Sequence, residues 1–148
     1  MQPHSRERLV EGDSLTFAFD VNKTDEWRAN DIWMNYKGHN CVEYSVALRA
    51  DGKSEVFRRN CWIPDMRKFE SVGANVRANV RHANGVTKYW VWIPWANLGL
   101  DEQLKAGAKI GFATVLYSSD GGEVKTNRLF GGIANPLDPM RYGVLELK

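Results

Sequence analysis

The stretch that decides the fold is Ala74–Pro94, ANVRANVRHANGVTKYWVWIP. At its centre is Asn84-Gly85, which is typical of a type I′ hairpin turn because both central residues of that turn need positive φ. A two-residue loop here places Val80 opposite Tyr89 on one face. A slip of one residue would move every side chain to the other face, so the apolar character of that face supports this register. The remaining pairs on it are Ala78 with Val91 and Val76 with Ile93.

The same register gives the hairpin a second face of different chemistry. It places Asn79 opposite Trp90 and Arg77 opposite Trp92. Sugars have apolar C–H faces that stack on aromatic rings and hydroxyl groups that need fixed polar partners, so this combination predicts a sugar-binding patch. In the alternative interpretation the indoles pack beneath another element and Arg77 is a structural cation–π partner.

Most of the remaining chain has a hydrophobic period of two, which is typical of strands. About eight short strands separated by turns, including Asp51-Gly52, predict an all-β fold, an antiparallel two-sheet β-sandwich of the jelly-roll kind. Only Asp101–Lys105 indicates a turn of helix. Asn22–Asn40 and Asn60–Gly73 are expected to be long loops that carry aromatic residues. The strands expected outside the hairpin are Ser14–Val21, Glu43–Arg49, Glu55–Arg58, Ile110–Tyr117, Val124–Phe130 and Tyr142–Leu147.

Length and charge restrict the class of protein. The 148 residues are enough for one core, which we assign to a single domain over residues 12–148, with residues 1–11 as a disordered or linker segment. The net charge of +2 arises from mixed acidic and basic residues, a pattern that argues against a nucleic-acid partner. No apolar run is long enough for a membrane span, and Met1–Val10 lacks the apolar stretch of a secretory signal.

The two cysteines, Cys41 and Cys61, leave two possibilities open. A disulfide would close a loop of about twenty residues and would stabilise the fold by about 3 kcal/mol. Two buried free thiols are the alternative, and the spacing matches no metal site.

Several motifs, in the same order along residues 12–147, resemble the successive strands of family 9 carbohydrate-binding modules and the related DOMON sandwiches. They begin with GDSLTFAFD and end with a Gly-Val-Leu-Glu-Leu strand. Trp90 departs from the pattern, because the position after the tyrosine is commonly acidic in that family. The motifs are Gly12–Asp20, Glu43–Leu48, Tyr89–Trp95 with Leu98, Ser119–Gly122, Gly131–Ile133, Asp138-Pro139 and Gly143–Leu147.

The resemblance implies a non-catalytic module that holds a plant or microbial polysaccharide, often at its chain end, between aromatic side chains. It also implies a secreted or cell-surface location and a linked glycoside hydrolase or lyase domain. Bound calcium in such modules is structural, and no other cofactor is implied. Trp95, in the shared Ile-Pro-Trp motif, is expected in the core.

These arguments give the candidate residues for binding sugar and calcium. For sugar we expect the aromatic and polar residues Trp33, Trp62, Trp90, Trp92, Arg77, Asn79 and Arg128; the last stands where relatives often have a binding arginine. For calcium we expect oxygen ligands from Asp20 and Asp25, and separately from Asp120.

Three other functions have some basis in the sequence. Glycoside hydrolysis would need two carboxylates across a cleft, chosen from Glu26, Asp31 and Glu43. Haem binding, as in DOMON domains, would need axial ligands from Met34, Met66 or Met140 with His39 or His82. An interaction module, in which a partner covers the aromatic face, would associate in a concentration-dependent way and ignore sugars.

Overall fold

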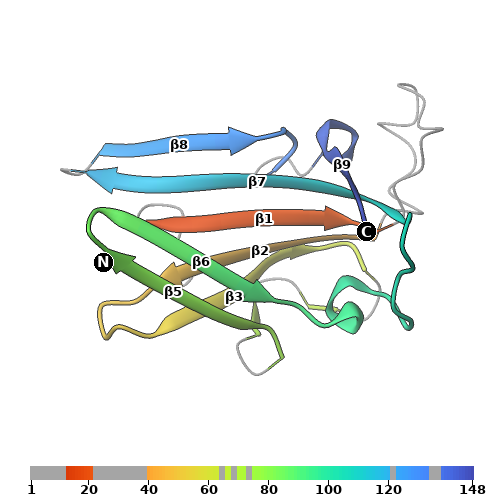
Figure 1. The fold of residues 1–148 in the computed structure, drawn as a ribbon, viewed down its shortest axis with the longest axis horizontal. Coiled ribbons are helices and arrows are strands. Elements are labelled where there is room, and N and C mark those ends of the chain that lie inside the picture. The colour runs from red at the N-terminus through yellow and green to blue at the C-terminus, as the bar shows by residue number, and fades with distance from the viewer. Residues whose placement is uncertain are drawn as a thin grey trace.

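The structure is a computed structural model that describes residues 13–21, 40–63, 66–67, 70–72, 75–120, 123–133 and 138–148. Within these residues the chain forms two antiparallel sheets packed face to face (Figure 1), which confirms the predicted β-sandwich. The predicted linker over residues 1–11 and most of the predicted loop Asn22–Asn40 lie outside the described residues. The strands are β1 (Ser14–Asp20), β2 (Cys41–Leu48), β3 (Ser54–Cys61), β4 (Glu70–Ser71), β5 (Arg77–Ala83), β6 (Val86–Trp92), β7 (Lys109–Asp120), β8 (Glu123–Leu129) and β9 (Gly143–Glu146).

The larger sheet has seven strands, in the order β4-β3-β2-β1-β7-β8, with β9 also paired to β7. The long strand β7 makes this possible, because its outer edge is divided between two partners. Residues 114–120 pair with β8 and residues 109–112 pair with β9. The inner edge of β7 pairs with β1 over its central part.

The central strand β1 is covered on both faces. Phe17 packs into the core beneath the smaller sheet, while Thr16 and Ala18 on the opposite face are also fully buried. Small side chains on that second face let the covering groups approach closely, and the Thr16 hydroxyl shares a 2.6 Å hydrogen bond with Ser45 Oγ on β2. The alternation of side chains along β1 therefore separates two buried faces, one of large apolar residues and one of small and polar residues.

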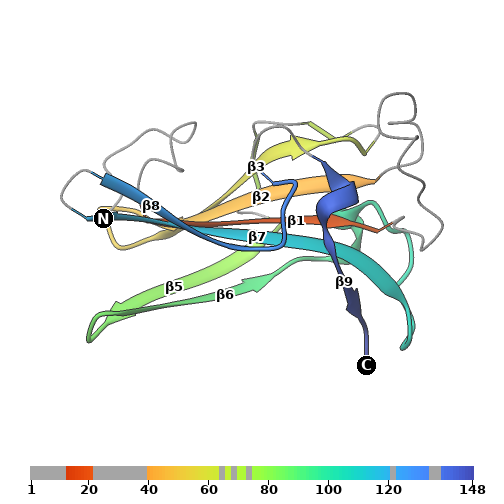
Figure 2. The ribbon, with the colours of Figure 1, turned by 90° about the horizontal axis from the view of Figure 1, so that it is seen from above.

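The smaller sheet is the hairpin β5-β6, and it lies on one side of the larger sheet (Figure 2). Its register is the predicted one: Val80 pairs with Tyr89, and Arg77 pairs with Trp92. Asn84 and Gly85 have φ of 52° and 73°, as a type I′ turn requires. The inward side chains join the main core cluster, whose members from the hairpin region are Val76, Val80, Ala78, Tyr89, Val91 and Ile93.

The helical prediction for Asp101–Lys105 is wrong, because these residues form bends and irregular structure. The helical turn lies slightly earlier, as the 3-10 helix η3 (Trp95–Leu98). Pro94 precedes it in an extended conformation, and Gly99 ends it with φ of 77°, so the stop signal falls before the predicted segment. A second 3-10 helix, η4, spans Pro139–Arg141. Within the described part of the chain, no helix is long and apolar enough to cross a membrane.

The predicted loop Asn60–Gly73 is also shorter than expected. Its first two residues extend β3, and Glu70–Ser71 add the two-residue strand β4 at the edge of the larger sheet. Arg58 explains this pairing, since its guanidinium donates to Glu70 at 3.0 Å and to the carbonyl oxygen of Arg67 at 3.1 Å.

Both cysteines are free thiols. Cys61 pairs with Val42 across β2 and β3, so the two share one face of the sheet, whereas Cys41 precedes Val42 and lies on the opposite face. The two sulfur atoms are therefore directed away from each other, and the disulfide alternative does not hold. Burial, followed by the neighbouring Asp20 carboxylate, raises the pKa of Cys41 well above its usual range.

Candidate functional site

The outward face of the hairpin carries two large exposed aromatic side chains. Trp90 is 51% exposed and Trp92 is 58% exposed, although both flank residues that pack inward. Arg77 and Asn79 lie directly across from them on β5 and are also exposed. The hairpin thus presents the four predicted residues together, and the indoles are not packed beneath another element of the described chain.

Arg77 and Trp92 form a stacked pair. The guanidinium carbon of Arg77 lies 5.3 Å from the centroid of the Trp92 ring system, which is within cation–π range. This contact fixes the orientation of the indole without burying it, since more than half of its surface stays open to solvent. The stack pre-orders an aromatic surface and so reduces the entropy that a bound ligand would have to offset.

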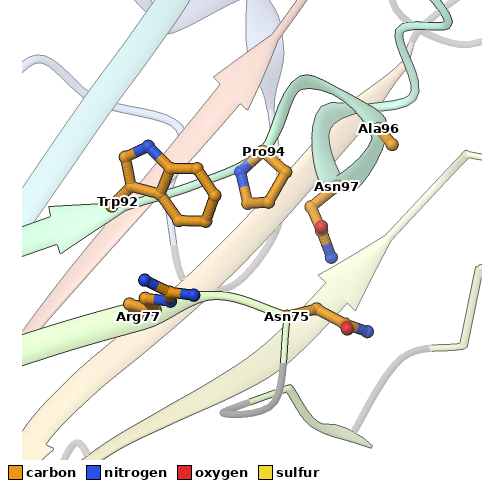
Figure 3. Close-up of a pocket in the computed structure, with 6 residues that line it drawn as sticks. All are labelled: Asn75, Arg77, Trp92, Pro94, Ala96 and Asn97. Atoms are coloured by element: carbon orange, nitrogen blue, oxygen red, sulfur yellow. The ribbon is translucent and has the colours of Figure 1, made fainter.

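A hollow of about 510 Å³ adjoins Trp92 (Figure 3). It combines an aromatic ring and a proline with two amides and a guanidinium, which is the mixture expected of a small polar ligand site. Arg77 begins β5 and Asn75 lies two residues before it, whereas Trp92 ends β6 and the other three lining residues follow that strand. The residues that line the hollow are Asn75, Arg77, Trp92, Pro94, Ala96 and Asn97.

The far wall of the hollow is η3, and the core holds it in place. The buried Tyr44 donates its hydroxyl proton to the carbonyl oxygen of Asn97 at 2.6 Å. Burial is the main cause that raises the pKa of Tyr44. At the end of η3, Gly99 has φ of 77° and a Cβ there would lie 2.9 Å from Ile63 Cδ1, so any other residue would strain the backbone and displace the Ile63 side chain.

The structure does not bring Trp62 and Arg128 to this site. Trp62 is partly buried against the cluster on the opposite face of the larger sheet, which includes Ala113 and Val115. Arg128 is exposed on β8 and pairs with Val115, which directs its side chain to that same opposite face. Trp33 lies outside the described residues. Trp95, expected in the core, is partly buried and packs against the main core cluster.

The calcium ligands predicted from the sequence do not form a site among the described residues. Asp20 is fully buried at one end of β1, with the Cys41 thiol beside it, whereas calcium takes oxygen ligands. Asp120 ends β7 nine residues beyond the partner of Asp20, roughly 30 Å away along the strand. Asp25 lies outside the described residues. No group of three or more His, Cys, Asp or Glu residues in the described ranges could hold a metal ion, so structural calcium stays a prediction.

The described residues among the candidates for catalysis and haem binding lie in separate parts of the fold. Glu43 is fully buried on β2, with Oε1 3.4 Å from Arg59 Nε. His82 is exposed near the hairpin turn, where Nδ1 shares a 2.8 Å hydrogen bond with Thr87 Oγ1, and such a position lacks the apolar enclosure of a haem site. Met66 packs against the core. The other candidates, Glu26, Asp31, Met34 and His39, lie outside the described residues, as does the side chain of Met140.

Sequence reasoning missed four residues of this region. Asn75 and Asn97 both line the hollow, but Asn97 is brought close to Asn75 only by the turn that follows Pro94. Arg81 and Lys88 form the next outward cross-strand pair after Asn79 and Trp90, and the register alone could have identified them.

Comparisons with known proteins bear on the fold. No protein-family model matches the sequence, and a search of curated proteins finds no match. A search of solved structures finds a family 9 carbohydrate-binding module from Caldicellulosiruptor kristjanssonii, in complex with glucose, with a TM-score of 0.62 at 14% sequence identity. The match covers 100% of this chain and 64% of that chain, so this chain spans about two thirds of the similar structure. This match supports the expected family 9-like fold but gives no support to the expected relation to the DOMON group. This chain therefore shares the β-sandwich fold of a family 9 carbohydrate-binding module.

Proposed function

We propose that this chain is a non-catalytic carbohydrate-binding module that recognises a glycan through the outward face of the β5-β6 hairpin. The observation that carries the proposal is the pair of exposed indoles, Trp90 and Trp92, beside a hollow lined by Asn75, Arg77 and Asn97. The indoles offer stacking surfaces for sugar rings, and the amides and guanidinium offer hydrogen bonds to hydroxyl groups.

Several features support binding without chemistry. None of the described residues that line the hollow is a carboxylate, whereas glycoside hydrolysis needs two. The site lies on a regular hairpin packed on a larger sheet, so its geometry is largely formed before the ligand arrives. An open site with two stacked rings and a few hydrogen bonds should give dissociation constants of roughly micromolar to millimolar.

The biological setting belongs to the same proposal. The similar structure is a carbohydrate-binding module bound to glucose, which supports a sugar ligand for this chain. From the sequence resemblance we propose a plant or microbial polysaccharide as the target, a linked glycoside hydrolase or lyase as the partner, and a secreted or cell-surface location.

Titration of intrinsic tryptophan fluorescence with a panel of soluble oligosaccharides tests this function. A saturable change with one class of glycan is expected, and Trp90→Ala or Trp92→Ala should weaken binding at least tenfold, about 1.4 kcal/mol. Trp62→Phe is the matched control, because it removes an indole from the opposite face and should leave the affinity unchanged.

The interaction module is the second candidate, and the same exposed aromatic face favours it. A folded protein that binds no glycan, and whose sedimentation coefficient rises with concentration, would replace the carbohydrate proposal with this one. Trp90→Ala should then restore a monomer.

A further inference from the structure

The outward face of the hairpin is cationic as well as aromatic. Arg77, Arg81 and Lys88 are exposed and belong to outward-facing cross-strand pairs. No carboxylate belongs to this face of β5 and β6, although the chain as a whole carries nearly balanced charge. The residues of this face are Arg77, Asn79, Arg81 and Ala83 on β5, and Val86, Lys88, Trp90 and Trp92 on β6.

These cations differ from Arg49, Arg58 and Arg59, which have acidic partners. Arg58 pairs with Glu70 at 3.0 Å, and an Arg49 nitrogen lies 3.6 Å from Glu55. Among the described residues, no carboxylate forms an ion pair with the hairpin cations. Their positive charge is thus available to an incoming anion.

The cationic and indole side chains form a row along the outward face of the hairpin. Successive outward pairs on a hairpin are about 6.6 Å apart, so Arg77-Trp92, Asn79-Trp90 and Arg81-Lys88 follow each other over roughly 13 Å. Cationic groups therefore lie at both ends of the aromatic surface. The guanidinium stacked on Trp92 still presents the N–H groups of its edge, which can bind a carboxylate or sulfate in a bidentate way.

We infer that the preferred ligand is an anionic oligosaccharide, whose rings stack on Trp90 and Trp92 while its carboxylate or sulfate groups bind Arg77 at one end and Arg81 with Lys88 at the other. This inference rests on the proposed function, to which it adds the charge of the ligand. A neutral glycan would leave the three cations without an anionic partner, whereas an acidic one would neutralise them.

The strength of this preference depends on salt. The cations are exposed, so each contact is modest and is screened over about 10 Å at 0.1 M salt. We expect the acidic glycan to bind about tenfold more tightly than a neutral glycan of equal length at low salt, and this ratio should shrink at 1 M salt.

Calorimetric titration with three matched ligands tests the inference: a neutral oligosaccharide, an oligouronate and a sulfated oligosaccharide of the same length. Each is measured in 20 mM and 1 M sodium chloride against the unmodified chain and the double variant Arg81→Gln/Lys88→Gln. The double variant should lose most of the preference for acidic glycans while binding to the neutral glycan stays within about twofold. Lys125→Gln, which removes an exposed cation on β8, is the control and should change neither affinity.

The outcomes separate this inference from the proposed function. Equal binding of neutral and acidic glycans by a folded protein overturns the inference and leaves the proposed function intact. Binding of no glycan overturns both. A single-stranded oligonucleotide is included as a competitor, because stacking bases and phosphates suit the same surface, and tighter binding of it than of any acidic glycan also overturns the inference. Preference for the uronate or for the sulfate supports it and identifies the charged group.

Discussion

At the tip of the hairpin, Gly85 has φ of 73°, and a Cβ added there would meet nothing within 4 Å. The cost of a side chain at this position is therefore conformational alone. Gly85→Ala should lower the free energy of unfolding by about 1 kcal/mol. Urea denaturation followed by circular dichroism measures this change. Asn84→Gly, which keeps the positive φ available, is the control, and an unaltered midpoint for Gly85→Ala would contradict the turn type.

The two thiols should differ in reactivity. Burial raises the pKa of both Cys41 and Cys61, so neither is an activated nucleophile. Cys41 is fully buried, whereas Cys61 is partly exposed. A thiol reagent should therefore label Cys61 first in the folded protein and both at similar rates in urea, as mass spectrometry of peptides would show. An internal disulfide in the purified chain would contradict the structure.

The sequence predicted the position of a site residue only where the pairing register of its strand was known. The turn at Asn84-Gly85 placed Trp90 and Trp92 on one face correctly, because alternation along a strand is strict. Trp62 shows the limit: its position depends on where β3 ends and on the hydrogen bond from its backbone N–H to the carbonyl oxygen of Cys41, and neither has a local signal.

At the scale of elements, a hydrogen bond between described residues links the two sheets directly. Ser54 Oγ on β3 accepts the backbone N–H of Val80 on β5 at 2.8 Å. Ser54→Ala leaves that N–H without its acceptor and should cost about 1–2 kcal/mol. Hydrogen exchange followed by mass spectrometry should show faster exchange in β5 and β6, with β1 and β2 little changed. Ser118→Ala on β7 serves as the comparison, and uniform acceleration of all strands would argue against a local effect.

Strand prediction succeeded where a pattern of period two ended at a turn signal. Asp51-Gly52 is such a signal, and Gly52 there has φ of 78°. Prediction failed where long-range contacts decide the structure: β4 exists because Arg58 binds Glu70, and the helical turn follows Pro94. The hydrophobic period also could not show that both faces of β1 are buried, because its second face consists of small and polar residues.

At the scale of the whole molecule, buried phenol groups should make the protein sensitive to alkali. Burial raises the pKa of Tyr44, Tyr117 and Tyr142, and burial followed by the Asp13 charge raises the pKa of Tyr89 to about 12. The folded state thus holds these protons after the unfolded chain has begun to release them near pH 10. The contribution of these phenols to stability should be constant from pH 7 to 9, and stability should fall as the pH rises from 10 to 12.

Urea denaturation at a series of pH values measures this decline. Tyr89→Phe should make it shallower between pH 10 and 12, because one group that titrates differently in the two states is removed. Stability that is independent of pH up to 12 would show that the phenols are equally accessible in both states.

The order of strands in the larger sheet has a consequence for synthesis. Strand β1 lies between β2 and β7, and the hydroxyl of Thr114 donates to the carbonyl oxygen of Thr16 across 98 residues of sequence. At a translation rate of about 5–20 residues per second, one edge of β1 stays unpaired for roughly 5–20 seconds until β7 has been synthesised. During that interval a nascent chain with Phe17 and Phe19 near an open edge is exposed to neighbouring chains, so the ribosome-bound intermediate should need protection by chaperones more than the finished protein does.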